Sequence, residues 1–220
     1  MSNRPVVFVG STLPVEEARS ILDADYRPPV KRGDIDALLA DPPSAIGIVD
    51  GEFFQSLAIS PKEVLRAIER GIPVFGASSM GALRAVELEP FGMIGLGTVF
   101  ERYRSGEIDA DDEVAVTFSP EGHRPLSEAM INIRIALVEA AAVGVITGRD
   151  CKRLIAMARR MYFPERSYPN LWRKAAGRIP QESLTALRAY LTEHNPDAKR
   201  EDARLMLCRM AKIGPIERRS

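Results

Sequence analysis

Up to about residue 120, short apolar runs alternate with amphipathic stretches. The runs cover residues 6–9, 45–49, 72–75 and 114–116. Short apolar runs bounded by turn residues are typical of strands that are buried on both faces. Because helical patterns separate them, we expect parallel pairing through right-handed crossovers. The pattern predicts an α/β fold, with a Rossmann-like, mostly parallel sheet of about four strands and helices on both faces.

One helix start in this region is especially clear. Ser60 is a preferred N-cap, Pro61 suits the first helical position, and Glu63 completes a capping box. The helical pattern then ends at Gly71, directly before the third apolar run. This strand–helix–strand order, with short links, supports the parallel sheet.

After residue 125 the strand pattern ends and helical spacing takes over. One predicted helix face carries Leu126, Met130, Ile133, Leu137 and Ala141. Thr147 and Asp150 form a second capping box, and further helices are expected over residues 167–177, 180–194 and 199–212. We therefore expect a sheet domain of residues 1–125, followed by a helical part of residues 126–220 that packs on it.

Composition and charge narrow the function classes. Apolar residues make up 45% and charged residues 27% of the chain, and 30 basic residues balance 30 acidic ones. This balance argues against a general nucleic-acid binder, and no apolar run is long enough to span a membrane. Two cysteines, Cys151 and Cys208, and two histidines, His123 and His194, do not form the usual zinc patterns. We expect a cytoplasmic protein with no metal and no cofactor.

The third strand leads into the most informative segment, Gly-Ala-Ser-Ser-Met-Gly-Ala at residues 76–82. Ala77, Ser79 and Gly81 follow the small-x-Ser-x-small pattern of a nucleophile elbow, where a sharp strand-to-helix turn presents a serine hydroxyl. A following helix N-terminus would favour an oxyanion. The same residues also suit a helix cap at Ser78 or Ser79, or an anion site without chemistry. The spacing does not match the GxGxxG pattern of nucleotide-binding loops.

A serine nucleophile needs a base, and His123 in the loop after the fourth run is the candidate. Asp50, at the end of the second strand, or Glu113 could orient its imidazole. Residues at the same sheet edge or on the next helix are candidates for substrate binding. These residues are Gly10, Ser11, Gly51, Ser78, Met80, Gly81, Arg84, Arg124, Glu128 and Asn132. Alternatively, Arg124, Glu128 and Asn132 are only the solvated side of an amphipathic helix.

Several longer segments together resemble the TfuA-like core family, over about residues 5–172. The segments include Val-Asp-Gly-x-Phe at 49–53, the elbow extended to 74–88, Asp-Asp-Glu-Val-Ala-Val at 111–116, residues 124–134, and Phe-Pro-Glu-Arg-Ser-Tyr-Pro at 163–169. The resemblance implies a partner of YcaO enzymes, which activate a peptide-backbone amide with ATP. The implied product is a backbone thioamide, in a ribosomally made peptide natural product or in methyl-coenzyme M reductase.

The resemblance also implies that the chain supplies or recruits sulfur, and one route takes it from a thiocarboxylated ubiquitin-like sulfur carrier protein ending in Gly-Gly. Ser79, with the Met80 N–H nearby, would then attack the thiocarboxylate and release sulfide. Glycines at positions 10, 51 and 81 would admit the thin carrier tail, and Arg84 or Arg124 would hold its negative charge. The alternative is a non-catalytic protein that binds YcaO, with the carrier or the precursor peptide, and raises thioamidation.

Overall fold

The computed structural model describes residues 4–53, 57–119, 125–194 and 196–213. The chain divides into two compact units. The sheet unit comprises Met1–Asp109 and Lys199–Ser220, and the helical unit comprises Ala110–Ala198. Within the described segments, we find no helix whose length and hydropathy would let it cross a bilayer.

The sheet unit is built on five parallel strands in the order β2-β1-β3-β4-β5. The strands are β1 (Val6–Phe8), β2 (Asp25–Arg27), β3 (Ile46–Ile48), β4 (Val74–Ala77) and β5 (Ile94–Leu96). The three central strands are fully buried, whereas the two edge strands are partly exposed. Since all strands are parallel, their carboxyl ends share one edge of the sheet, where open α/β folds bind ligands.

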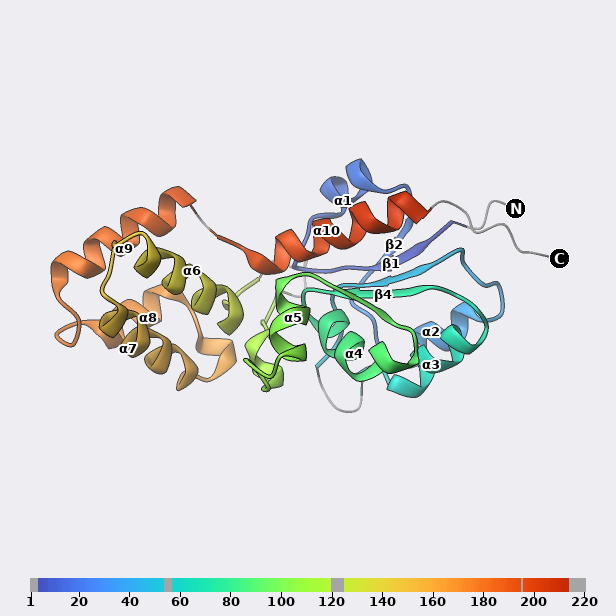
Figure 1. Ribbon diagram of the computed structural model, residues 1–220, viewed down its shortest axis with the longest axis horizontal. Helices are drawn as coiled ribbons and strands as arrows, with labels where there is room; N and C mark the ends of the chain where they lie inside the picture. The colour runs from blue at the N-terminus through green and yellow to red at the C-terminus, as the bar shows by residue number, and fades with distance from the viewer. Residues whose placement is uncertain (1–3, 54–56, 120–124, 195, 214–220) are drawn as a thin grey trace. The chain divides into compact units, whose positions relative to one another are not determined.

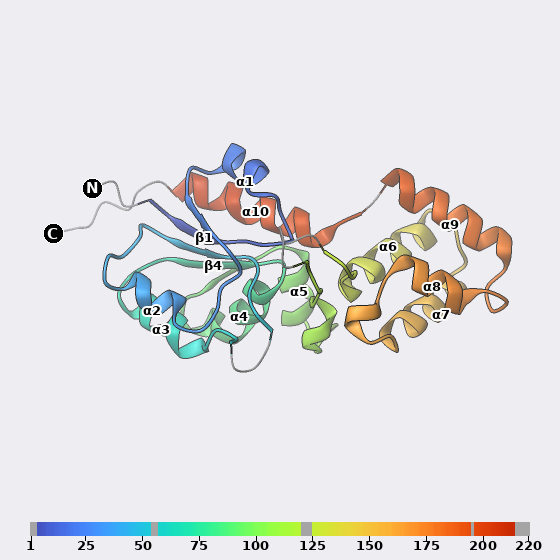
Figure 2. The ribbon, with the colours of Figure 1, turned by 180° about the vertical axis from the view of Figure 1, so that it is seen from behind.

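Helices cover both faces of the sheet (Figures 1 and 2). α1 (Val15–Ile21) and α10 (Ala198–Ile213) lie on one face. α2 (Asp34–Leu38), α3 (Pro61–Glu69), α4 (Met80–Leu88) and α5 (Thr98–Arg104) lie on the other, with a short 3-10 turn, η1 (Glu89–Phe91), before β5. The last helix of the chain is therefore part of the sheet unit.

Apolar contacts and one glycine hold α10 on the sheet. Ala203, Met206, Leu207 and Met210 are buried against the same face as Val7, Val49 and Phe75. A Cβ on Gly47 of β3 would lie only 2.9 Å from the Met210 Sδ, so the glycine lets the helix approach closely. Arg200 and Arg204 of α10 also form ion pairs with Glu17 of α1.

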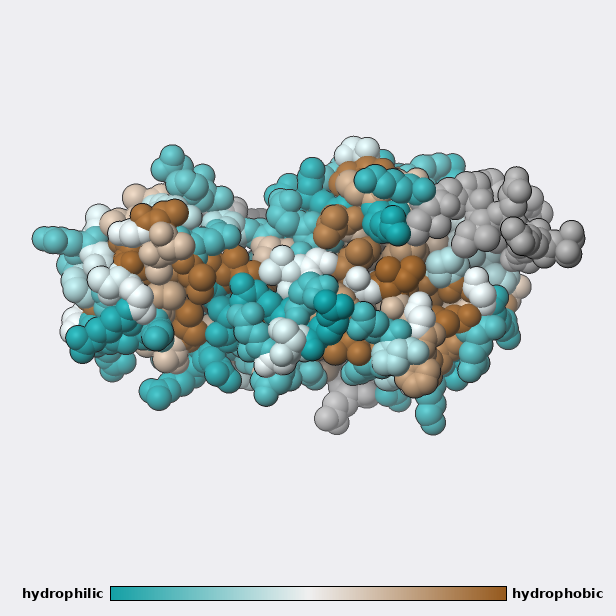
Figure 3. Space-filling model, viewed as in Figure 1, coloured by the Kyte–Doolittle hydropathy of each residue, from teal (hydrophilic) through white to brown (hydrophobic). Residues whose placement is uncertain are grey.

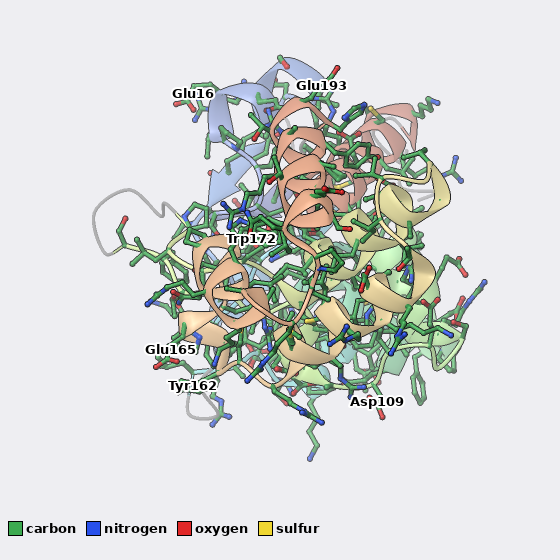
Figure 4. The ribbon with its side chains drawn as sticks, turned by 90° about the vertical axis from the view of Figure 1, so that its left-hand side faces the viewer. Glu16, Asp109, Tyr162, Glu165, Trp172 and Glu193 are labelled. Carbon is green, nitrogen blue, oxygen red and sulfur yellow. The ribbon has the colours of Figure 1, made fainter. Side chains whose placement is uncertain are left out.

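The helical unit has its own core. It contains η2 (Asp111–Glu113), α6 (Met130–Ala142), α7 (Gly148–Arg159), η3 (Phe163–Glu165), α8 (Tyr168–Ala175) and α9 (Gln181–His194). Buried residues from all four α-helices, such as Ile133, Leu154, Leu171 and Leu187, form one cluster. On the outside, shown in Figure 4, Tyr162 lies beside Glu165 with 67% of its surface exposed.

A fully buried arginine joins the loops of the helical unit. The Arg166 guanidinium donates to the Asp112 Oδ2 at 2.7 Å and to the Asp112 carbonyl oxygen at 2.8 Å. It also donates to the carbonyl oxygens of Ala158 and Met161, both at 3.3 Å. Because every bond fixes a loop or a helix end, this arginine has a structural role in tying η2 to the end of α7.

The α/β architecture, with helices on both faces and a C-terminal helical part, is confirmed. The capping box at Ser60 is confirmed, and the Thr147 hydroxyl accepts from the Asp150 N–H. The strand predicted at residues 114–116 is wrong: these residues follow η2 as irregular chain, with Val114 and Ala115 buried. The sheet instead has five strands, because β2 and β5 form from segments that are not continuous apolar runs.

Candidate functional site

The turn between β4 and α4 has an unusual backbone. Ser78 follows the last residue of β4 and has φ of +69°, the only positive φ of a non-glycine residue in the described chain. The Ser79 N–H donates to the Ala77 carbonyl oxygen at 2.8 Å, which closes a three-residue γ-turn around Ser78. This form of γ-turn is rare and strained for an L-residue. The chain thus reverses within two residues, and α4 begins at Met80.

Two glycines make this sharp turn possible. A Cβ on Gly81 would lie 1.8 Å from the Ile48 carbonyl oxygen, and a Cβ on Gly76 would lie 2.2 Å from the Gly81 carbonyl oxygen. The Gly81 N–H donates to the Val49 carbonyl oxygen at 3.2 Å. The first turn of α4 therefore rests directly on the backbones of β3 and β4, as the small residues of a nucleophile elbow require.

The two serines of the turn differ in their hydrogen bonding. Ser78 is fully buried, and its Oγ is the only buried side-chain nitrogen or oxygen among the described residues that has no hydrogen-bond partner. Ser79 is 2% exposed, and its hydroxyl caps no N–H of α4. A buried hydroxyl without a partner costs about 1–3 kcal/mol, so its presence in a strained turn calls for a functional explanation.

Asp50 lies at the neighbouring strand end and is fully engaged. Its Oδ2 accepts from the Gly10 N–H at 2.8 Å and from the Thr12 N–H at 3.1 Å. Its Oδ1 accepts from the Thr12 hydroxyl at 2.6 Å. These bonds tie the loop after β1 to the end of β3, at the point in the strand order where ligands usually bind in such sheets.

The end of β3 also contacts the serine turn. A Cβ on Gly51 would lie 2.7 Å from the Met80 Cγ, and one on Gly10 would lie 2.5 Å from the Pro29 Cγ. The exits of β1, β3 and β4 are therefore in contact with one another. Most of the predicted site residues lie there, namely Gly10, Ser11, Asp50, Gly51, Ser78, Ser79, Met80 and Gly81.

Other predicted site residues lie elsewhere. The Arg84 guanidinium binds both carboxylate oxygens of Glu87 at 2.7 Å and the Ile59 carbonyl oxygen at 3.2 Å. Its charge is therefore already matched. His123 and Arg124 lie outside the described residues.

Glu128 and Asn132 belong to the helical unit. There the Asn132 amide donates to the Glu128 Oε1 at 3.2 Å and to the Asp197 Oδ1 at 2.9 Å. Burial, together with the carboxylates of Glu128 and Asp197, raises the pKa of the Tyr168 hydroxyl.

Both cysteines lie on helices, and neither belongs to the strand exits that form this edge. Burial raises the pKa of the Cys151 thiol, which disfavours its reactive thiolate, and Cys151 lies in α7 of the helical unit. Cys208 lies on the exposed side of α10. In the described segments, no three His, Cys, Asp or Glu side chains cluster closely enough to hold a metal ion.

Two comparisons with known proteins bear on the identity of the chain. A search of curated proteins found no match. A family model for TfuA-like proteins matches residues 50–167, which is more than half of the chain. The match begins at Asp50 and includes the whole turn from β4 into α4. The chain therefore belongs to the TfuA-like family.

Proposed function

We propose that this protein supplies sulfur to a YcaO enzyme by hydrolysing a thiocarboxylated ubiquitin-like sulfur carrier protein. Its family is associated with YcaO enzymes in forming backbone thioamides. The observation that supports hydrolysis is the Ser78–Ser79 turn, where a positive φ, close-packed glycines and an unpaired hydroxyl coincide. A strained strand-to-helix turn that packs on small residues is typical of a nucleophile elbow.

The reaction is an acyl transfer in two steps. A serine Oγ attacks the thiocarboxylate carbon, and its proton passes to a base. The base returns this proton to the departing sulfur, which leaves as hydrosulfide, so that the carrier's last glycine becomes esterified to the serine. Water then cleaves the ester, releasing the carboxylate form of the carrier and regenerating the hydroxyl. The N–H of Met80, at the start of α4, lacks an intrahelical partner and is a donor for the tetrahedral oxyanion.

The geometry favours Ser78 over Ser79 as the nucleophile. Ser78 has the positive φ that places a nucleophile at the apex of an elbow, and its hydroxyl has no structural bond to lose. Ser79 remains the alternative, since it is the N-cap residue of α4 without acting as a side-chain cap. His123 remains the proposed base.

A second function is favoured by the burial of both serines. Ser78 is 0% and Ser79 2% exposed, so a carrier tail can reach either hydroxyl only after neighbouring groups move. If neither serine hydroxyl becomes accessible, the protein would act without catalysis. It would bind YcaO and its peptide substrate and in this way raise thioamidation. The two functions differ in whether sulfide is released without YcaO.

The purified protein should therefore be incubated with a thiocarboxylated carrier in the absence of YcaO. We expect sulfide release that Ser78→Ala lowers at least ~100-fold, as loss of a nucleophile does. Ser105→Ala is a matched control, since Ser105 is an exposed serine of the same unit, and it should leave the rate unchanged. No release from wild-type protein, together with intact YcaO binding, would establish the recruitment role instead.

A further inference from the structure

The two units pair their exposed cations differently. In the sheet unit, Arg66 binds Asp36 at 2.6 Å. Arg27 of the same unit binds Asp25 at 2.9 Å. In the helical unit, α7 and its C-cap carry four cations that form no ion pair with any residue the structure describes, namely Arg149, Lys152, Arg159 and Arg160. Cations left unpaired along one helix are available to an anionic partner.

These cations lie on one face of α7, opposite the buried Leu154 and Ala158. The exposed positions follow the spacing of three and four residues that shares a helix face. They are Arg149, Lys152, Arg153, Ala156, Arg159 and Arg160. Because a helix rises about 1.5 Å per residue, the first three cations lie roughly 12 Å from the last two. Figure 3 shows hydrophilic side chains along the lower margin of the helical unit, where Figure 1 draws α7.

The first group of cations does not help α7 to form. Arg149 is the second residue of the helix, where the helix dipole disfavours a positive charge. It also lies three residues before Lys152 and four before Arg153, and like charges at these spacings repel one another. The second group differs, because cations at the end of a helix stabilise it. The first group therefore has no stabilising role in the helix, and an anionic partner would relieve its repulsion.

The carboxylates around α7 do not balance this charge. Asp150, the only acid of α7, is buried and lies 3.8 Å from the Arg153 guanidinium. The neighbouring α8 has no acid and adds two exposed cations, Arg173 and Lys174. Two acids of η2 already bind arginines, namely Asp112 with Arg166 and Glu113 with Arg134. The other acids of α6, η2 and η3 are Glu139, Asp111 and Glu165. Even if all three faced α7, the cations of α7 and α8 would remain in excess.

We propose that this face of α7 binds an acidic segment of a partner protein, with two groups of Asp or Glu side chains roughly 12 Å apart. A second copy of the chain fits less well, because symmetric pairing through α7 would bring like charges together. A nucleic acid fits less well too, since the chain has 30 basic and 30 acidic residues and so lacks the net positive charge that attracts a polyanion. The inference does not depend on hydrolysis, because it concerns binding alone.

A random peptide library displayed on phage, panned against the full chain, tests the proposal. We expect enriched sequences with two groups of Asp or Glu, and a synthetic copy should bind at least ~5-fold more weakly to Lys152→Glu. This variant should melt no lower than wild type, because it places an acid three residues after Arg149. Lys62→Glu is the matched control, since Lys62 is an exposed lysine near the start of α3 in the sheet unit, and it should bind within about twofold of wild type.

Other ligands complete the test. Exchanging the Asp and Glu residues of the peptide for Asn and Gln should weaken binding at least ~10-fold. A single-stranded RNA of mixed sequence and vesicles containing phosphatidylserine should both bind more weakly than the acidic peptide. Ser78→Ala should bind the peptide normally, which separates this site from the proposed reaction. The proposal would be overturned by a lack of acidic sequences among the enriched peptides, by equal binding to Lys152→Glu and wild type, or by tighter binding of RNA or vesicles that Lys152→Glu removes.

Discussion

The loop after β1 and the turn after β4 lie at the same edge of one sheet. They differ in hydrogen bonding, because the polar groups of the loop have partners and the Ser78 hydroxyl of the turn has none. In the β1 loop, the N–H groups of Gly10 and Thr12 and the Thr12 hydroxyl all bind Asp50. In the β4 turn, the Ser78 hydroxyl has no partner and the backbone is strained. Saturated bonds stabilise the fold, whereas an unpaired group in a strained turn is characteristic of chemistry or binding.

The close packing of α4 on β3 predicts that the glycines beneath the serine turn cannot be replaced without loss of stability. Gly81→Ala should lower the free energy of unfolding by more than about 3 kcal/mol, because its Cβ would meet the Ile48 carbonyl oxygen at 1.8 Å. Gly148→Ala is the matched control, since no atom lies within 4 Å of its Cβ position at the start of α7. Chemical denaturation of both variants measures the difference, and equal stability would mean that α4 does not rest on β3 as described.

The hydrogen bonds of the loop after β1 all depend on the Asp50 carboxylate. Asp50→Ala leaves the donors of Gly10 and Thr12 without an acceptor and should cost about 3 kcal/mol of stability. Asp50→Asn keeps the shape and should cost roughly half as much. Asp23→Ala removes only an exposed ion pair with Arg4 and should change stability by less than about 0.5 kcal/mol. If Asp50→Ala matches Asp23→Ala in urea melts, the loop is held by other contacts.

A second carboxylate whose oxygens both accept hydrogen bonds predicts how stability depends on pH. Asp202 of α10 accepts from the N–H groups of Thr98 and Val99, both at 2.7 Å. Burial raises its pKa to about 6, although these two bonds act in the opposite direction. Because the folded protein then holds the proton more tightly than the unfolded chain, this group's contribution to stability grows as the pH falls through about 6.

Wild type should therefore gain about 1–2 kcal/mol over Asp202→Asn between pH 7 and about pH 4.5. Denaturation of both proteins across that range measures the gain, and a constant difference would show that Asp202 does not titrate there. This test adds a second contrast with the serine turn. Asp202 is a buried polar group with two hydrogen-bond partners, whereas the Ser78 hydroxyl has none.

The smallest predicted change is a gain in stability at the serine turn. Ser78→Gly removes an unpaired hydroxyl and relieves a positive φ, so it should raise the free energy of unfolding by about 1 kcal/mol. Thr12→Val should do the reverse, since it removes a bond to Asp50. Thermal melts of the two variants decide the point, and a loss of stability in both would mean that Ser78 is an ordinary structural residue.

The parts of the fold that sequence predicts well are those with strong local signals. The central strands are continuous apolar runs, and α3 carries its capping box at Ser60. The edge strands are missed because β2 is Asp-Tyr-Arg and β5 lies in a segment with glycines at 92, 95 and 97, so neither shows a continuous apolar run. The run at residues 114–116 is apolar because it is buried in irregular chain of the helical unit, where burial does not require a strand.

The candidate site shows the same division. The segment from Gly76 to Gly81 identifies the strand-to-helix turn from its small residues alone. The small-x-Ser-x-small spacing, however, centres on Ser79, whereas the residue with positive φ is Ser78. No sequence signal marks this difference, because serine has no preference for that conformation and only the packing of α4 on β3 imposes it. The bonds from the β1 loop to Asp50 are likewise set by the strand order.

The most direct test of the account is to trap the carrier on the protein. A thiocarboxylated carrier is mixed with the protein, quenched in acid within the first turnover and digested with trypsin, which releases the peptide of residues 71–84 containing both serines. The account predicts that fragmentation places the carrier's C-terminal tryptic fragment on Ser78. Sulfide released without an adduct on this peptide, or with the fragment elsewhere, would contradict it.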